Sequence, residues 1–281
     1  MKKLSAQYIR PPQYFTFNFK ELWHYRELLF FFTWRDIKVK YKQTILGFIW
    51  AVLQPLLLML IFTFFFAQTL KISTNGIPAP IFYYSGLVLW NLFSSALNFA
   101  GNSMISNAEM IKKIYFPRLI IPISATLVAL FDFFMALSLF LLLLIYYQWS
   151  SSDLNINYFN LFFFIASATL LTLIGTMGIS LSLAALNVQY RDFRYIIPFL
   201  IQFLFFVSPV IYPITVFEDW QYLEYILALN PMTGALEMMR ACFVEKANWL
   251  VVQISSTAAL LYLLIGVYVF RKMEAYFADL A

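Results

Sequence analysis

The side chains of this chain that could carry out chemistry are few and scattered. None of the eight glycines is followed by lysine, so the GxxxxGK[ST] loop that holds nucleotide phosphates does not occur, and HExxH and GxSxG are absent from the sequence as well. The single cysteine, Cys242, cannot form an intrachain disulfide, and the single histidine, His24, has no carboxylate pair or nucleophile beside it. We therefore expect no catalytic residue, no metal site and no cofactor bound by this chain.

Charges within apolar sequence are the remaining candidates. Asp132 is the only formal charge inside the membrane spans predicted below. A carboxylate at that depth is costly, so it either has a role in mechanism or accepts structural hydrogen bonds. Glu237 and Arg240 lie three residues apart in an apolar segment, close enough on one helical face to form an ion pair. The alternative is an exposed pair on a surface helix, which contributes at most about 1 kcal/mol.

The composition is typical of an integral membrane protein. Of the 281 residues, 62% are hydrophobic and only 12% are charged, whereas a soluble chain carries charge on about a quarter of its residues. Apolar runs, uncharged except for Asp132, predict six transmembrane helices, at about 45–67, 81–100, 119–147, 161–186, 196–213 and 249–270. Alternate segments between these spans hold 16 Lys and Arg on one side and 3 on the other. Because such residues stay on the cytoplasmic side, both termini are expected there.

These spans predict an all-α protein with one membrane domain. Residues 1–33 are expected to form a cytoplasmic arm that ends in an amphipathic helix, at 19–32, lying along the membrane surface. Residues 34–273 are expected to form the transmembrane domain, and residues 274–281 a cytoplasmic tail.

Two connections between the spans have a pattern of their own. The cytoplasmic loop 107–116 predicts a short helix with Asn107 as its N-cap. The outer connection 213–248 holds two apolar pieces, 226–229 and 235–244, that are too short to cross a membrane. Such pieces predict short re-entrant helices between spans five and six, here broken at Asn230, Pro231 and Gly234.

Three stretches carry a resemblance to a known family: WRDIKVKYKQTILGFIWAVLQPLL at 34–57, NVQYRDFRYIIPFLIQFLFFVSPVIYP at 187–213 and LNPMTGALEMMR at 229–240. They resemble the membrane subunits of type 2 ABC exporters that move polysaccharides, the O-antigen, capsule and teichoic-acid group. The resemblance implies a homodimer of this permease around a channel, with ATP and Mg²⁺ on two separate ABC nucleotide-binding subunits. It further implies export of a lipid-linked glycan across the bacterial cytoplasmic (inner) membrane, with membrane lipids and no nucleic acid as other partners.

The resemblance also implies roles for particular residues. The helix at 19–32 would be an interface helix, and the outer segment 213–244 would be a gate that includes Glu237 and Arg240. The short helix at 107–116 would couple the permease to the ATPase through apolar anchors, namely Ile111, Ile114, Tyr115 and Phe116. Sugars stack on aromatic rings, so the candidates for the channel wall, with core or membrane-surface packing as the alternative for each, are Trp50, Tyr83, Tyr84, Trp90 and Tyr212.

Two other functions stay open at this point. The same architecture serves type 2 ABC exporters of a drug, an ion or another lipid. An integral membrane enzyme that modifies lipids is the more remote alternative, because no catalytic constellation is present. The neighbouring genes would distinguish these functions, since a lone ATPase beside glycosyltransferases favours glycan export.

Overall fold

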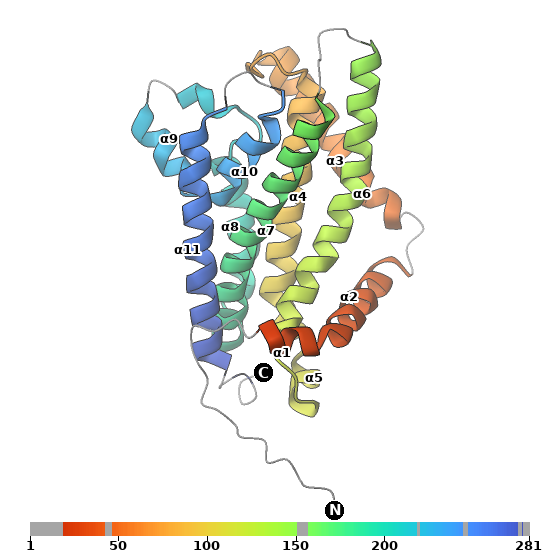
Figure 1. The fold of residues 1–281 in the computed structure, drawn as a ribbon, viewed down its shortest axis with the longest axis vertical. Coiled ribbons are helices and arrows are strands. Elements are labelled where there is room, and N and C mark those ends of the chain that lie inside the picture. Colours follow the sequence, from red (N-terminus) through yellow and green to blue (C-terminus); the bar gives the residue numbers. More distant parts are fainter. Residues whose placement is uncertain are drawn as a thin grey trace, which may run out of the picture.

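A computed structural model of the chain describes residues 19–42, 47–150, 157–217, 220–243, 247–274 and 277. Every regular element within these residues is a helix, which confirms the all-α prediction for this part of the chain (Figure 1). The elements are α1 Phe19–His24, α2 Arg26–Tyr41, α3 Gly47–Phe62, the π-helical η1 Thr63–Thr69, α4 Ala79–Ser106, α5 Ala108–Lys113, α6 Ile120–Ser150, α7 Tyr158–Gln189, α8 Phe193–Val207, the 3₁₀ turn η2 Ile214–Phe217, α9 Gln221–Ala228, α10 Pro231–Arg240 and α11 Trp249–Glu274.

Helix α4 lies at the centre of the bundle. It packs against α3, α6, α7, α8 and α10, and α7 packs along α11 (Figure 1). Because α4 has neighbours on all sides, its residues 81–90 are buried without interruption. Helix α5 projects from one end of the bundle and α9 from the other, and these are called the α5 end and the α9 end below (Figure 1).

Within the described part of the chain, four segments are long and apolar enough to cross a membrane, namely Ile49–Thr69, Ile120–Ser150, Tyr158–Gln189 and Trp249–Glu274. Helix α4 has sufficient length but carries several Asn, Ser and Gly residues in its second half. Its position inside the bundle explains this composition, because few of its side chains would meet lipid. Helix α8 has 15 residues, a length of about 22 Å, which is shorter than a hydrocarbon core of about 30 Å.

The span predicted at 196–213 is wrong at its outer end. Helix α8 stops at Val207, and Ser208 has an extended backbone with φ −79° and ψ 141°. Pro209 gives the physical reason, since a proline forces the residue before it out of the helical region and has no N–H to donate. The chain therefore turns between Ser208 and Pro213 instead of continuing as a helix.

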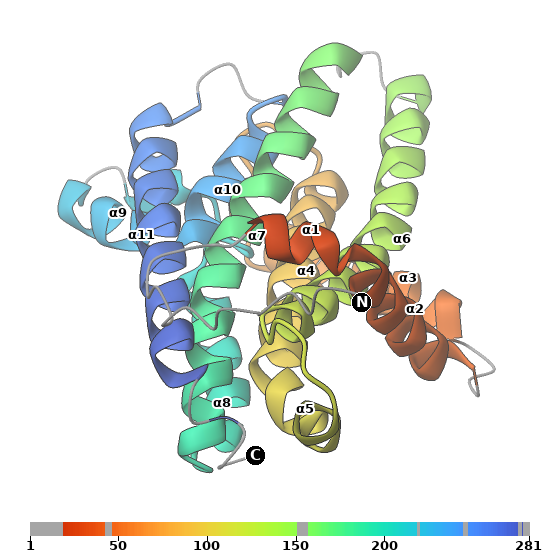
Figure 2. The ribbon, with the colours of Figure 1, turned by 60° about the horizontal axis from the view of Figure 1, so that its bottom comes forward.

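The amino-terminal helix extends further than predicted. It is interrupted at Tyr25, and α2 then runs to Tyr41, so the expected domain boundary at residue 33 falls inside a helix. Phe32 is buried against the bundle, while Phe30 and Phe31 are exposed, and the amphipathic role of this helix stays a prediction. Figure 2 looks toward the α5 end and shows α1 and α2 lying across the bundle.

Small residues allow the helices to approach closely in the other half of the bundle. A Cβ atom added to Gly178 would lie 2.3 Å from the carbonyl carbon of Tyr262, and one added to Gly266 would lie 2.1 Å from the carbonyl oxygen of Gly178. Glycine is therefore required where α7 crosses α11. A Cβ atom added to Gly175 would lie 2.5 Å from the side chain of Pro231, so glycine also allows α10 to pack closely against α7.

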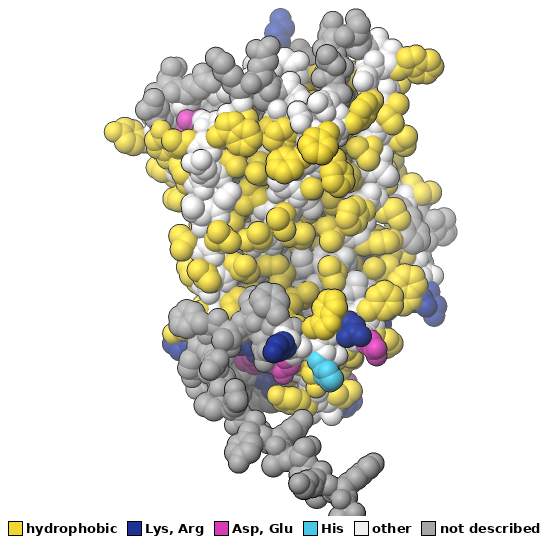
Figure 3. Space-filling model, in the orientation of Figure 1, with side chains coloured by type: hydrophobic (Ala, Val, Ile, Leu, Met, Phe, Trp, Pro, Cys, Tyr) yellow, Lys and Arg dark blue, Asp and Glu magenta, His cyan; other side chains and the backbone are white. Residues whose placement is uncertain are grey.

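The distribution of side chains on the surface is typical of a protein embedded in a membrane. On the face drawn in Figure 3, apolar side chains cover the middle of the molecule, and Lys and Arg gather near the α5 end. Exposed apolar side chains include Leu57 of α3, Leu142 of α6 and Leu264 of α11. Contact of these apolar side chains with water is unfavourable, whereas contact with lipid is not.

Candidate functional site: the α5 knob and the α9–α10 segment

Helix α2 is attached to α6 through the carboxylate of Asp132. Lys40 and Tyr41, at the end of α2, both donate to this carboxylate, and the Lys40 pair is only partly exposed. The sequence predicted a lone intramembrane charge, but Asp132 has two partners on the basic helix. These contacts fit the structural hydrogen-bonding alternative for Asp132, the charge of Lys40 offsets the cost of its partial burial, and a role in mechanism stays a prediction.

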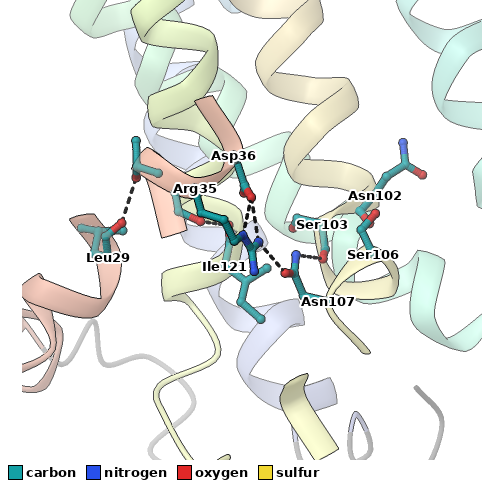
Figure 4. Close-up of polar contacts among 10 residues, drawn as sticks. Leu29, Arg35, Asp36, Asn102, Ser103, Ser106, Asn107 and Ile121 are labelled. Carbon is teal, nitrogen blue, oxygen red and sulfur yellow. Dashed lines mark hydrogen bonds and ion pairs between the residues drawn. The ribbon is translucent and has the colours of Figure 1, made fainter. Parts of the chain in front are cut away.

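The middle of α2 is attached to the turn between α4 and α5. The Arg35 guanidinium binds Asp36 Oδ1 at 2.7 Å and Asn107 Oδ1 at 2.9 Å (Figure 4). The Asn107 amide in turn donates to the carbonyl of Ser103 at 2.9 Å. Asn107 occupies the N-cap position of α5, as predicted, but its side chain makes no capping hydrogen bond. It instead links α2 to the end of α4.

A cavity of about 1090 Å³ lies where these helices meet. Its lining comes from α2, α4, α5 and α6, and it includes the charged residues Arg35, Asp36, Lys40, Glu109 and Lys113. These charges are of both signs, and Arg35 pairs with Asp36 and Lys113 with Glu109. The cavity thus marks a loosely filled junction of four helices.

The predicted coupling residues divide into two pairs. Ile111 and Phe116 are buried, and the Phe116 ring packs edge-on against Phe32 of α2 at a centroid distance of 5.5 Å. Ile114 and Tyr115 are 60% and 86% exposed. The buried pair holds the α5 knob, residues 107–116, against α2, and only the exposed pair is available to a partner.

The α9–α10 segment satisfies its own backbone. Asn230 Oδ1 accepts from the N–H of Met232 at 3.1 Å and so caps α10, and Thr233 donates to the carbonyl of Leu227 at 2.7 Å. Both side chains thus satisfy backbone groups where α9 meets α10. The predicted break at Gly234 is wrong, because α10 continues through it. A side chain at residue 234 would collide with Ser255 of α11, so the close packing there requires glycine.

Arg240 ends α10 and is almost fully buried. Its two terminal nitrogens donate to the carbonyls of Pro209 and Val210, at 2.7 and 3.0 Å, and its guanidinium lies 3.6 Å from the ring centroid of Phe82. Burial lowers the pKa of Arg240 to about 10, so it stays protonated at neutral pH. Among the described residues, no ion pair joins Arg240 to Glu237. This corrects the predicted pairing, since backbone carbonyls freed by the end of α8 take the place of the carboxylate.

The five aromatic candidates for a channel wall lie in different environments. Tyr83 and Tyr84 are fully buried in the core, and Tyr84 donates to the carbonyl of Ala136 at 3.1 Å. Trp90 is buried against Phe205. Core packing accounts for these three. Tyr212 is partly buried and donates to the carbonyls that end α8. Trp50 alone of the five is exposed, at 51%, so a role in a channel wall stays a prediction for it.

Comparison with known proteins identifies the family of this chain. The model of a family described as ABC-2 type transporter matches residues 27–244, more than half of the chain. The chain belongs to the ABC-2 type transporter family. The matched range runs from α2 to the residues just after α10, so this ABC-2 protein carries both the α5 knob and the α9–α10 segment within its family domain.

Several relatives of this ABC-2 protein are named as polysaccharide exporters. One is an O-antigen export system permease protein, RfbA, of Myxococcus xanthus, 31% identical over 228 residues, which cover 80% of this chain and 84% of the relative. The RfbA protein of Klebsiella pneumoniae is 26% identical over 90% of this chain and 95% of its own length. The polysialic acid transport protein KpsM of Escherichia coli is 24% identical over 73% of this chain and 77% of its own.

Proposed function

We propose that this chain is the permease subunit of an ATP-driven exporter of a lipid-linked polysaccharide of the O-antigen type. The observation that carries the proposal is its similarity, over most of both chains, to permeases named for O-antigen export. Two copies would enclose the channel, and the membrane would be the bacterial inner membrane. The sequence has no phosphate-binding loop of its own, so separate nucleotide-binding subunits would supply the energy.

The contacts of α2 suggest how that energy would reach the membrane helices. A nucleotide-binding subunit would contact the exposed residues Ile114 and Tyr115 of the α5 knob. The knob is attached to α2 through Phe116 and Asn107, and α2 is attached to α6 through Asp132. A movement of the knob would therefore be passed to α6 by α2, past the cavity at their junction.

The proposal includes six crossings of the membrane with both ends of the chain in the cytoplasm. The crossings would be α3 with η1, α4, α6, α7, α8 and α11, and the α5 end would face the cytoplasm. In a background with Cys242→Ser, Lys112→Cys should resist an impermeant thiol reagent added to intact spheroplasts, and Tyr222→Cys should react with it. Labelling of the residue 112 variant from outside would contradict this orientation.

Deletion of the gene tests the function itself. A strain without this chain should lose the surface polysaccharide and accumulate the lipid-linked glycan inside the cell, and a plasmid copy should restore export. The control is deletion of the gene for the nucleotide-binding subunit, which should give the same accumulation. If the deletion strain still displays its polysaccharide, the proposed function is wrong. If it loses resistance to a drug instead, the chain exports a different class of substrate.

A further inference from the structure

A polar pocket of about 590 Å³ lies at the α9 end, outside the cavity described above. Its walls come from the connection before α4, from η2, from α9 and α10, and from the start of α11, which Figure 1 shows together at that end. The volume falls within the range of about 300–1000 Å³ that is usual for small-molecule sites. Two parts of the chain that are distant in sequence, the connection before α4 and the stretch from η2 to the start of α11, are therefore brought together around a space large enough for a ligand.

The lining of this pocket combines hydrogen-bonding groups with aromatic rings. Carboxylates come from Glu224 and Glu237, amides and a hydroxyl from Asn75, Asn248 and Thr215, and rings from Tyr225 and Trp249. The two rings are partly exposed. Carboxylate and amide oxygens accept hydrogen bonds from hydroxyl groups, and aromatic faces cover apolar C–H surface. This mixture suits a ligand that is polar at its edges and apolar on its faces.

The polar groups of this pocket include a buried donor without a hydrogen-bond partner. On the pocket wall, Glu224 accepts from the Asn248 amide at 2.7 Å. Glu237 supplies the second carboxylate, and a carboxylate can accept several hydrogen bonds. Arg240, on the inner wall, is only 4% exposed, and its Nε–H is buried with no hydrogen-bond partner among the described residues. A buried donor without a partner is costly, and a ligand oxygen or a water would satisfy it.

The charges narrow the class of ligand. Two carboxylates face one guanidinium that is already bound to backbone carbonyls, so an anion such as a phosphate would be repelled. The described residues contain no group of three His, Cys, Asp or Glu that could hold a metal ion. A purely apolar ligand would leave the carboxylates without solvent or partners. A neutral ring that carries several hydroxyl groups fits both the carboxylates and the aromatic rings of this pocket, and that is the chemistry of a sugar.

We propose that this pocket binds a sugar unit of the exported glycan on the side of the membrane to which the glycan is delivered. This inference rests on the proposed function and adds a site to it. The rings of Trp249 and Tyr225 would stack on the sugar face, and Glu237 would accept from its hydroxyl groups. A weak site of this kind would hold the emerging glycan beside the α9–α10 segment and oppose the return of the glycan into the channel.

Direct binding tests the site without transport. The purified complex of permease and nucleotide-binding subunit, in lipid nanodiscs without ATP, is titrated with short oligosaccharides released from the surface polysaccharide of the source strain, and binding is followed by saturation-transfer NMR. Saturable binding is expected for the wild type. Trp249→Ala and Glu237→Gln should each weaken it about tenfold, which corresponds to about 1.4 kcal/mol. Trp249→Phe, which keeps a ring, should bind nearly as well as the wild type.

The matched control is Trp149→Ala, in the last turn of α6. Trp149 is 92% exposed and does not line the pocket, so its removal should leave binding unchanged. Absence of saturable binding, or unchanged affinity in both Trp249→Ala and Glu237→Gln, would overturn the site while a positive gene-deletion result leaves the proposed function standing. A deletion strain that still exports its glycan would overturn both. Size-exclusion profiles of the variants establish that each is folded before it is titrated.

Discussion

Tyr115 and Phe116 should be substituted separately, because we expect Tyr115 to contact the ATPase subunit and Phe116 to hold the α5 knob in place. The two residues are adjacent in sequence, but Tyr115 is 86% exposed and Phe116 is buried against Phe32. Phe116→Ala removes a buried ring and should lower the free energy of unfolding by about 3–5 kcal/mol. Tyr115→Ala alters only the surface and should change it by less than about 0.5 kcal/mol. A variant that combines both changes could not separate these effects.

The affinity for the nucleotide-binding subunit should be lowered directly by Tyr115→Ala, the variant with the smaller effect on stability. If Tyr115 is an anchor that fills a groove on that subunit, its removal should cost about 2 kcal/mol of binding free energy. That cost weakens the affinity roughly thirtyfold and should reduce stimulation of ATP hydrolysis in parallel. Titration of the ATPase subunit onto nanodisc-bound permease gives the affinity, and thermal unfolding of the same sample gives the stability.

The matched control is Tyr222→Ala, at the other end of the molecule. Tyr222 is 87% exposed, so the substitution removes the same side chain from an equally exposed position. It should change neither the affinity nor the ATPase rate. If Tyr115→Ala retains wild-type affinity and stimulation, Tyr115 is not an anchor, and the coupling role of the α5 knob would have to rest on Ile114 alone.

Two further substitutions test the contacts that hold the bundle together. Asp132→Asn removes the charged partner of Lys40, and this ion pair is partly exposed. The loss of unfolding free energy should therefore lie between roughly 1 kcal/mol, as for an exposed pair, and about 3–5 kcal/mol, as for a broken buried pair. A thermal midpoint equal to that of the wild type would refute a stabilising role. Gly178→Ala places a methyl group against the backbone of α11 and should cost about 1–3 kcal/mol, measured by the same assay, whereas Ala166→Val on an exposed face of the same helix should cost little. Equal midpoints for these two variants would contradict the close crossing of α7 and α11.

The helices of this chain could be predicted from the sequence because their signals are local. Long apolar runs mark α6, α7 and α11, and polar or charged residues such as Asn157, Arg191 and Arg271 mark where these runs end. The end of α8 has a local signal as well, since Pro209 excludes a helical Ser208. An uncharged run alone predicts a span across Pro209, and the effect of the proline on the preceding residue is what shortens it.

The partners of the buried charges could not be predicted in this way. Lys40 and Asp132 are 92 residues apart, and Arg240 and Pro209 are 31 apart, so their contacts depend on the packing of whole helices. A proximity rule along one helix paired Arg240 with Glu237, but the guanidinium satisfies the carbonyls at the end of α8. Tyr83 and Tyr84 illustrate a related limit, because an aromatic ring in sequence looks the same in a core and in a channel wall.

The contacts of α2 make this helix the natural link between the α5 knob and the membrane helices. Phe32 and Arg35 contact the knob, and Lys40 and Tyr41 contact Asp132, with helical backbone throughout between them. Phe32 and Lys40 are eight residues apart, about 12 Å along the axis, a distance over which an α-helix moves as a rigid rod. Both ends are held by a charged group, since the Arg35 guanidinium donates to Asn107 at the knob and the Asp132 carboxylate accepts from Lys40 and Tyr41. Because hydrogen bonds to charged groups require fixed geometry, a displaced knob should move α2 as a whole and carry the displacement to Asp132 of α6.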